Sequence, residues 1–315
     1  MKPMAATGPG AGRSDQPVAL DRLIASRLPV PACGVVSATA YQAVASTPAI
    51  AELIDALRAA PSPEPQHLSH EQERVDHASL TVPVPSSIET SIVDLAREIG
   101  DGGRVAVRSS ATLEDTEGAS CAGQFRSILD VGPDDVIQAV RLVWASLWHP
   151  APRSYRRARS IDESDLGMAV VVMRMVDATT AGVVFTVDPE GDESMLRIET
   201  VEGLGDKLVS GATTPEKALV PRHGRSGLDR QLADIRKLAL RAESVLGAPQ
   251  DVEWAAEGSR VWIVQSRPIT TAAPSGTEVS SADDHDQAAG EGSTTWTPVA
   301  IEGMAPGVLT PCCGA

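Results

Sequence analysis

The sequence predicts an α+β fold of two lobes and does not favour a doubly wound parallel sheet. Segments with strand character follow one another with only turns between them at 169–176, 182–188 and 195–201, and a hairpin is expected at 252–268. Helical segments lie between these groups instead of alternating with single strands, which is typical of an α+β architecture. Hydrophobic residues make up 42% of the 315 residues, which is enough for a core. Since aromatic residues are only 3%, that core must consist of Ala, Val, Leu and Ile.

The N-terminal third contains the first helices. Residues 1–17 are rich in Gly, Pro and Ala, and we expect them to be disordered. Residues 18–60 are typical of a helix, a short strand and a helix, and the three prolines in 61–70 predict a loop. Residues 86–100 begin with Ser, carry apolar side chains at helical spacing and end in Gly, which predicts a helix with both ends marked.

The remaining elements follow from the same periodicities. We expect strands at 104–110, 125–131, 169–176, 182–188, 195–201 and 217–222, helices at 133–148 and 228–247, and a hairpin over 252–268 that turns at Glu257 and Gly258. These elements divide into an N-terminal lobe, 18–172, and a C-terminal lobe, 173–270. After Thr270 the composition changes to Ser, Ala, Gly and Asp, so 271–293 is expected to be a linker.

Charge and cysteine content limit the classes of partner. The net charge of −15 is spread along the chain and disfavours nucleic acid or an anionic membrane surface, both of which need a basic surface. No run approaches the ~20 apolar residues of a membrane span, and the first residues lack the apolar stretch of a signal peptide. The four cysteines form no C-x-x-C. We therefore expect a cytoplasmic protein whose anionic ligand, if any, meets a local cluster of Arg or Lys.

The first candidate site segment is VAVRSSATLEDTEGASCAGQF. Arg108 ends an apolar strand, and its planar guanidinium suits a phosphate because it donates two parallel hydrogen bonds. The small residues around Gly123 could present backbone N–H groups to a polyphosphate. Taken alone, a loop of Gly and Ser is more often a simple turn.

The second segment is the hairpin DVEWAAEGSRVWIVQSRP. Gln265 and Arg267 are two residues apart and share one face of a strand, and Glu253 lies on the partner strand. Carboxylate and amide oxygens are the hard ligands that Mg²⁺ accepts, with phosphate oxygens and waters completing its coordination. The alternative is that these polar residues form the solvated face of the hairpin.

The third segment, GLGDKLVSG, carries Gly203, Gly205 and Lys207. It matches neither a P-loop nor the glycine pattern of a dinucleotide fold, and a single G-x-G is weak evidence of a nucleotide site.

Together these segments resemble the nucleotide-binding domain shared by phosphoenolpyruvate synthase, pyruvate phosphate dikinase and rifampin phosphotransferase. The resemblance covers most of 18–270 and rests on motifs in the family's order. They are LPVPACGVVSATAY, VAVRSSATLED, GASCAGQFRSIL, VWASLWHPAPRSYR, AVVVMRMVDATTAGVVFTVDP, GLGDKLVSG and VEWAAEGSRVWIVQSRPIT. The resemblance implies an ATP-grasp-like fold with ATP and Mg²⁺ between two lobes. It also implies a reaction in which ATP phosphorylates a His on a swivelling domain, releasing AMP and phosphate.

The resemblance also assigns residues to the expected site. Arg108 and Arg267 correspond to phosphate-binding arginines, Gly123 and Ser127 to the glycine-rich loop and the strand after it, and Glu253 and Gln265 to metal and nucleotide ligands.

Two positions depart from the family pattern. Gln16 stands where the family has a lysine that contacts ATP, and Met173 where it has a Gln near the adenine. Losing one charge-assisted phosphate contact costs on the order of 1.5–3 kcal/mol, so weaker binding is expected rather than its loss.

The phosphoryl-accepting histidine of the resemblance is not found in the sequence. Residues 294–315 resemble the start of the next family domain, and no G-G-x-x-S-H-A sequence surrounds any of the six histidines. We therefore expect ATP and a separately encoded phosphohistidine domain as partners. The alternatives are a nucleotide-binding module without turnover and a truncated or decayed relic of a longer enzyme.

Overall fold

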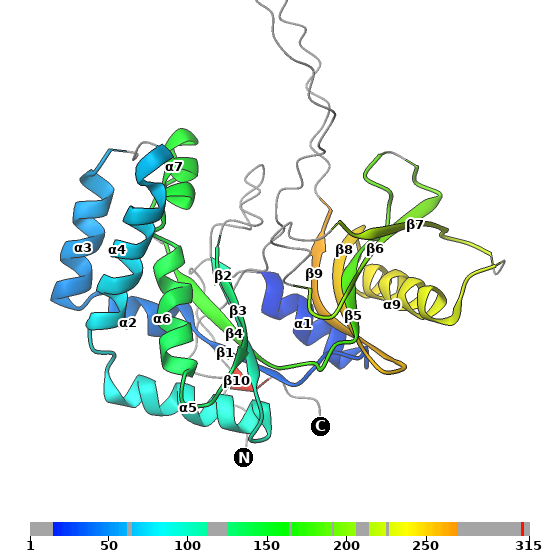
Figure 1. Cartoon of the computed structure of the whole chain (residues 1–315), viewed down its shortest axis with the longest axis horizontal. Helices are drawn as coiled ribbons and strands as arrows, with labels where there is room; N and C mark the ends of the chain where they lie inside the picture. Colours follow the sequence, from blue (N-terminus) through cyan, green and yellow to red (C-terminus); the bar gives the residue numbers. More distant parts are fainter. Residues whose placement is uncertain are drawn as a thin grey trace, which may run out of the picture.

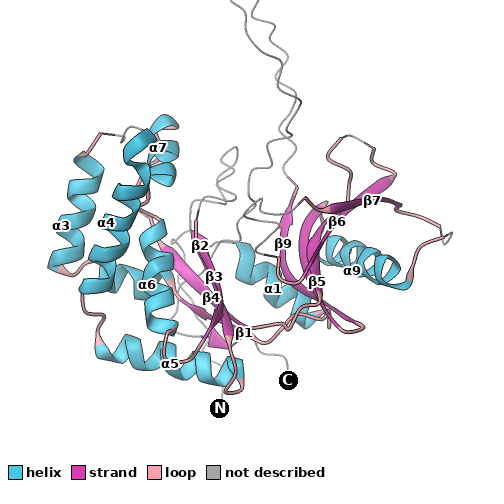
Figure 2. Ribbon diagram, viewed as in Figure 1, coloured by secondary structure: helices cyan, strands magenta, loops and turns pink. Residues whose placement is uncertain are grey.

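The computed structural model describes residues 15–61, 65–111, 125–163, 166–190, 192–205, 214–224, 227–269 and 310–311. Within these ranges the chain forms two antiparallel five-stranded sheets with helices on their outer faces (Figures 1 and 2). Among the described helices, none combines the length and apolarity that crossing a membrane requires.

The first sheet, sheet A, belongs to the part of the chain that carries most of the helices. Its strands, in spatial order, are β10 (Thr310–Pro311), β1 (Cys33–Val36), β4 (Met168–Arg174), β2 (Val105–Ala111) and β3 (Ser127–Val131). Helices pack on one face of this sheet, and they are α2 (Ala38–Ala45), α3 (Pro48–Ala59), α4 (Leu68–Thr81), α5 (Ser86–Gly100), α6 (Val136–Ser146) and α7 (Pro150–Ala158). Alternate residues of β2, among them Val105 and Val107, point into this helical core, so their neighbours point to the opposite face.

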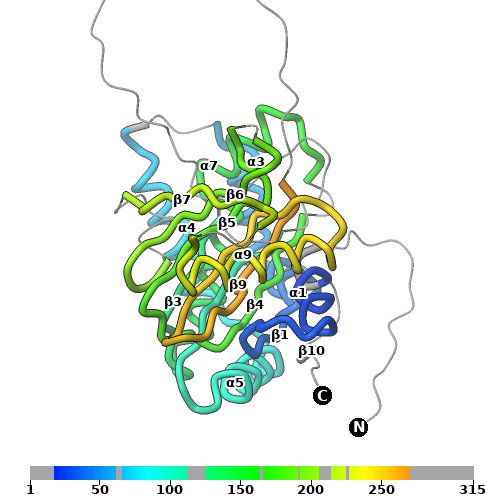
Figure 3. The backbone as a smooth tube through the Cα atoms, turned by 90° about the vertical axis from the view of Figure 1, so that its right-hand side faces the viewer, coloured from blue at the N-terminus to red at the C-terminus, as the bar shows by residue number. Residues whose placement is uncertain are grey.

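The second sheet, sheet B, is covered on one face by α9 (Arg230–Leu246), and α1 (Asp15–Ala25) packs beside α9 at the edge strand β9 (Arg260–Pro268). Its strands, in spatial order, are β7 (Glu216–Pro221), β6 (Met195–Glu202), β5 (Thr180–Phe185), β8 (Gln250–Glu257) and β9. Helices α1 and α9 contact one another and β9, and Leu23, Ile235 and Trp254 are buried in the core that they form. Figure 3 shows the molecule from the side of α9.

The two sheets meet through a buried apolar cluster. Val35 and Val171 of sheet A share this cluster with Ala181, Ala255 and Trp262 of sheet B. Because adjacent residues of a strand point to opposite faces, the cluster identifies which residues of each sheet face the other sheet. The polar site described below lies on these same faces.

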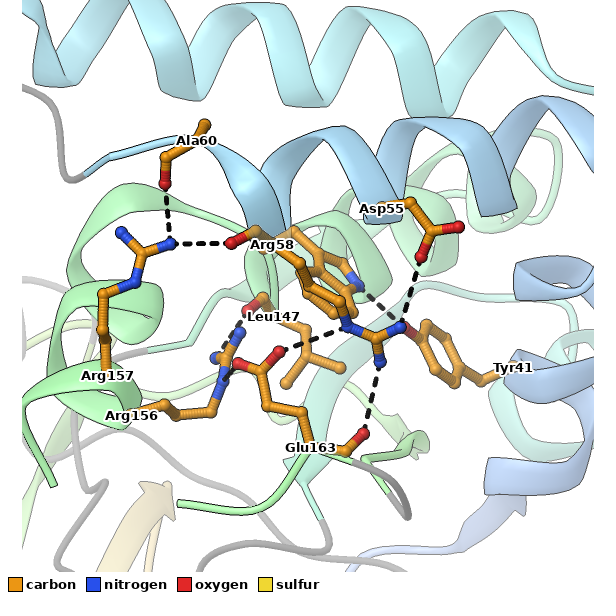
Figure 4. A network of polar contacts seen from close by, with 9 residues as sticks. Tyr41, Asp55, Arg58, Ala60, Leu147, Arg156, Arg157 and Glu163 are labelled. Atoms are coloured by element: carbon orange, nitrogen blue, oxygen red, sulfur yellow. Dashed lines mark hydrogen bonds and ion pairs between the residues drawn. The ribbon is translucent and has the colours of Figure 1, made fainter. Parts of the chain in front are cut away.

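The helices beside sheet A are also joined by a polar network (Figure 4). The carboxylate of Glu163 accepts hydrogen bonds from Arg156 (Nε–Oε1 2.6 Å) and Arg58 (Nε–Oε2 3.3 Å). Arg157 donates to the backbone carbonyl of Ala60 after α3, at 2.7 Å. These hydrogen bonds connect α3 with α7. They also provide partners for backbone carbonyl groups at the end of α3, which have none within the helix.

Two helices differ from the expectation. Residues 68–70, expected in a loop, begin α4, a helix in which only Val75 is fully buried, so its sequence shows little apolar periodicity. The helix expected over 133–148 ends at Ser146, and a separate helix, α7, starts with Pro150 at its first position, where proline is well tolerated.

The ends of the expected lobes also differ from the structure in detail. The first turn of α1 includes residues 15–17, which were expected to be disordered, because the helix packs on α9. Helix α1 precedes sheet A in the sequence but packs against sheet B, and the expected boundary between 172 and 173 falls inside β4. Residues 271–293 lie outside the described residues.

Candidate functional site

Arg108 lies on the face of sheet A that meets sheet B. In the sheet it is paired with Ser127 of β3 on one side and Val171 of β4 on the other, so these three side chains share one face. Val171 belongs to the apolar cluster between the sheets, so this face of sheet A is the one directed toward sheet B. Ser127, expected at the site from the sequence, is therefore the direct neighbour of Arg108. Its hydroxyl is buried and has no hydrogen-bond partner in the described residues.

Arg108 reaches across to Glu253 of β8. Its Nη1 lies 3.6 Å from Glu253 Oε2, and both residues are buried, with 8% and 7% of their surfaces exposed. Burial raises the pKa of Glu253 to about 7, although the charges of Arg108 and Arg267 act against this rise. A separation of 3.6 Å is longer than a hydrogen bond, so the guanidinium and the carboxylate both keep donor and acceptor capacity for a ligand.

Gln265 and Arg267 lie on β9, beside β8. Gln265 is the direct cross-strand partner of Glu253, and Arg267 is the partner of Asp251. Arg267 Nη2 lies 3.1 Å from Asp251 Oδ2. The structure thus brings Glu253, Gln265 and Arg267 together on the face that Arg108 approaches, as the spacing in the hairpin predicts.

The same face extends over strands that the sequence analysis did not include. The register pairs Glu253 with Val183 of β5, Val183 with Glu199 of β6, and Glu199 with Lys217 of β7, so this row of side chains lies on one side of the sheet. Glu199 is 2% exposed, and its Oε1 lies 3.7 Å from Lys217 Nζ. Burial raises the pKa of Glu199, and the charges of Lys217 and Arg197 act against this rise.

Asp251 and Glu199 are the acidic residues that sequence reasoning missed. Asp251 stands two residues before Glu253, and Glu199 stands two after Arg197, which is the spacing by which Gln265 and Arg267 were found. Burial also raises the pKa of Asp251, against the effect of Arg267. The alternation of side chains along a strand could therefore have pointed to both residues. It does not show which strands are neighbours in the sheet, and so it could not place these residues beside Glu253.

Many polar atoms between the sheets have no hydrogen-bond partner among the described residues. They are Arg108 Nε and Nη1, Glu253 Oε1, Asp251 Oδ1, Glu199 Oε1, and both side-chain polar atoms of Gln265. An unsatisfied buried polar group costs about 1–3 kcal/mol, and such groups are rare in folded proteins. Their concentration on one face is typical of a surface built to bind a polar ligand.

These atoms also fit a hard cation that is held together with phosphate. Glu253 Oε1 and Gln265 Oε1 are oxygen donors on neighbouring strands at paired positions. The described residues contain no group of three or more His, Cys, Asp or Glu placed to hold a metal by themselves. A Mg²⁺ ion here would need ligand oxygens, which is how this ion usually binds beside phosphates.

Other expected positions are less informative. Gly123 and Lys207 lie outside the described residues. Gln16 is in the first turn of α1, with no side chain described. Met173 is 1% exposed and belongs to the apolar cluster between the sheets.

The profile of the family described as pyruvate phosphate dikinase, AMP/ATP-binding domain, matches residues 18–234 and 226–288. A probable phosphoenolpyruvate synthase of Methanothermobacter thermautotrophicus is 34% identical over 296 residues, covering 80% of this chain and 43% of that protein. The prodigiosin synthesizing transferase PigC of Serratia marcescens is 34% identical, covering 81% of this chain and 31% of that protein.

A rifampicin phosphotransferase of Streptomyces sp is 31% identical, covering 81% of this chain and 33% of that protein. The chain therefore spans less than half the length of these relatives. Among solved structures, D-alanyl-alanine synthetase A from Vibrio cholerae shares 12% identity and a TM-score of 0.28, over 58% of this chain and 46% of that chain. The profile match covers most of the chain and agrees with the resemblance carried by its motifs. The protein belongs to the pyruvate phosphate dikinase AMP/ATP-binding domain family.

Proposed function

We propose that this chain binds ATP with Mg²⁺ between its two sheets, as a two-lobed ATP-grasp-like domain. In this proposal it serves an enzyme that phosphorylates a histidine on a swivelling domain, with release of AMP and phosphate. The observation that carries the proposal is the set of buried, unpartnered polar atoms around the Arg108–Glu253 pair. Membership of an AMP/ATP-binding family supports the nucleotide as their ligand.

Each residue of the site has a distinct task in this proposal. Arg108 and Arg267 hold phosphate oxygens from opposite sheets, because a guanidinium can donate two hydrogen bonds to one phosphate. Glu253 and Gln265 hold Mg²⁺, which would neutralise part of the phosphate charge when bound. Ser127, next to Arg108, donates its hydroxyl to the same phosphate. Gly123 contributes backbone N–H groups.

The chain's own residues orient the nucleotide but offer no acceptor for the phosphoryl group. Attack on the β-phosphorus needs a nucleophile held in line, and positioning provides most of the catalysis of phosphoryl transfer. No histidine in the part of the chain that the structure describes lies among the residues of the site.

In this proposal the imidazole comes from a separate phosphohistidine domain. Attack of that imidazole on the β-phosphorus breaks the bond to the AMP oxygen and gives a pyrophosphohistidine. Water then removes the γ-phosphate as inorganic phosphate, and the remaining phosphohistidine passes its phosphoryl group to a final acceptor.

Calorimetry with ATP and MgCl₂ tests the binding step. We expect binding that is weakened by chelator and lost in Arg267→Ala, while Arg260→Ala, a change of an arginine on the same strand near its turn, leaves it unchanged. Tight binding that survives both the chelator and Arg267→Ala would refute the site.

Transfer is tested with β-labelled ATP and a phosphohistidine domain taken from a relative. We expect acid-labile label on that domain only when this chain is present, and little AMP from the chain alone. Rapid AMP formation by the isolated chain would instead identify a self-contained enzyme. Nucleotide binding without transfer to any such domain would identify a binding module.

A further inference from the structure

A groove lined by arginines lies among the helices that pack on sheet A. It has a volume of about 540 Å³ and lies between the end of α3, α7 and the segment that follows α7. Leu57 and Trp148, which line it, belong to the helical core, so sheet A separates the groove from the face that carries Arg108. Its charged lining residues are Arg58, Arg153, Arg156, Arg157, Asp162 and Glu163. Four arginines against two acidic residues, in a chain whose net charge is −15, indicate a local surface suited to an anion.

Arg153 of α7 is the buried arginine whose hydrogen-bonding capacity is only half used. It is 4% exposed, and its Nη1 pairs with the carboxylate of Glu71, which lines the neighbouring groove between α3 and α4. Its Nε and Nη2, on the other edge of the guanidinium, have no hydrogen-bond partner within the part of the chain that the structure describes. These two nitrogens donate in parallel and form the fork that fits two oxygens of one carboxylate or phosphate. The ion pair with Glu71 therefore leaves a complete binding edge unused.

The carboxylate of Glu163 is shared between two other arginines of the groove. It accepts hydrogen bonds from Arg156 and Arg58, at the distances given above (Figure 4). Asp55 lies 3.5 Å from Arg58 Nη1, but its side chain is 76% exposed, and such an exposed pair contributes little. Because one carboxylate serves two guanidiniums, an anion beside Arg153 would lie in a positive local potential.

The unused edge of Arg153 is already out of water. Buried donors without an acceptor are rare in folded proteins, and an oxyanion that binds this edge would supply the missing acceptor without removing the donors from solvent. Ser160, which is exposed and lines the same groove, offers a hydroxyl near its mouth. The groove therefore suits a small ligand that reaches past its exposed residues to the buried fork.

We propose that this groove binds a small oxyanion, a phosphate or carboxylate group, through the Nε–Nη2 edge of Arg153. Glu71 positions that edge by holding Nη1, and the neighbouring arginines supply the positive potential. The site lies on the helical side of sheet A and does not depend on the proposed function, because none of its residues belongs to the nucleotide-binding face.

The test follows the indole N–H signal of Trp148, which lines the groove, in ¹H–¹⁵N spectra of the full chain; Trp148→Phe assigns the signal. Titration with inorganic phosphate, and separately with succinate, should shift this signal in a saturable way, and the tighter of the two identifies the anion as phosphate or carboxylate. Arg153→Lys keeps the charge beside Glu71 but removes the fork, so it should weaken binding by roughly tenfold. The matched control is Arg230→Lys, an 89% exposed side chain on α9, which should bind as the wild type does.

Two further variants separate this site from the nucleotide face and from folding. A Trp148 shift that survives in Arg267→Ala and is weakened in Arg153→Lys supports the groove, whereas the reverse pattern assigns the anion to the face between the sheets and overturns the inference. Should Arg153→Lys fail to fold, Arg153→Gln with Glu71→Gln removes both charges of the pair together and should show at least the same loss. The inference is also wrong if neither anion shifts the signal, or if the folded Arg153 variant binds as tightly as the wild type.

Discussion

The guanidinium of Arg108 lies 3.6 Å from the carboxylate of Glu253, and this buried pair joins sheet A to sheet B. Neither residue belongs to the helical cores on the outer faces of the two sheets. Removing one partner of a buried ion pair leaves the other charge buried without compensation. The resulting loss of stability is larger than the net stabilisation that the intact pair provides. The pair is therefore placed to respond to an anion that enters between the sheets.

Arg108→Met should lower the affinity for Mg-ATP roughly ten- to hundredfold, because one charge-assisted contact is lost. Fluorescence titration with a labelled ATP measures the change. The control is Arg97→Met on α5, whose side chain is 60% exposed, and it should bind as the wild type does. Equal affinities for Arg108→Met and wild type would exclude Arg108 from the site.

Glu253→Gln and Gln265→Ala should reduce the dependence of ATP binding on Mg²⁺, since each removes an oxygen ligand or its charge. Relative to the wild type, we expect each variant to bind ATP more weakly when MgCl₂ is present. When a chelator removes Mg²⁺, the difference in ATP affinity should be much smaller. Glu202→Gln, at the exposed end of β6, is the matched control. A loss that is the same with and without Mg²⁺ would argue for a phosphate or nucleoside contact instead.

Gly182→Ala should destabilise sheet B. A Cβ at this position would lie 1.8 Å from the carbonyl oxygen of Glu199 and 2.9 Å from the ring of Trp254, so the backbone of β6 would have to move. The expected loss is on the order of 3 kcal/mol or more, measured by chemical denaturation. Gly205→Ala, where the added Cβ would meet only Ala181 at 3.6 Å, should be close to neutral.

Tyr41→Phe should lower the free energy of unfolding by about 1–3 kcal/mol near neutral pH, because Trp148 Nε1 donates a 2.8 Å hydrogen bond to the Tyr41 hydroxyl. Burial raises the pKa of Tyr41 to about 12, while an unfolded tyrosine ionises near pH 10. A folded pKa above the unfolded value means that this stability is present below pH 10 and is lost as the pH rises through about 12. Denaturation at several alkaline pH values should therefore show the variant approaching the wild type. A constant difference across that range would contradict this.

Asp76→Asn should cost about 1–3 kcal/mol at neutral pH. Burial alone would raise the pKa of Asp76, but the hydrogen bond and charge of His149 and the charge of Arg126 outweigh it and lower the pKa. The carboxylate oxygens lie 2.8 Å from His149 Nε2 and 2.9 Å from Arg126 Nη1.

With a folded pKa below the unfolded one, the stability from Asp76 is present above the ordinary aspartate pKa and is lost as the pH falls through the folded value. The difference between variant and wild type should accordingly shrink in acid. Asp94→Asn, on the exposed face of α5, should change stability little at any pH. A difference that persists unchanged in acid would mean that Asp76 acts through packing alone.

The sequence by itself determined most of the local elements and the family. Period-two spacing places Gln265 and Arg267 on one face of β9, and helical spacing predicts α5 with its observed bounds. Both features depend on residues close together in the chain, so they can be read without knowing the fold. The residues that end α5 differ from the prediction, since Pro85 is its N-cap and Asp101, in the left-handed region, its C-cap. Helix α4 escaped prediction because it buries too little to show an apolar stripe.

Tertiary structure decided which of these residues meet. Glu199 and Lys217 join the row of Glu253 only because β5 and β6 lie between β8 and β7, and strand order is not contained in the spacing along any one strand. Arg108 reaches Glu253 because two sheets pack face to face through an apolar cluster, an arrangement set by the burial of many side chains from distant parts of the chain. Helix α1 packs on sheet B for the same reason: Leu23 is buried in the core that α9 forms with this sheet, while Leu20 lies in the cluster between the sheets together with Cys33 and Val35 of β1.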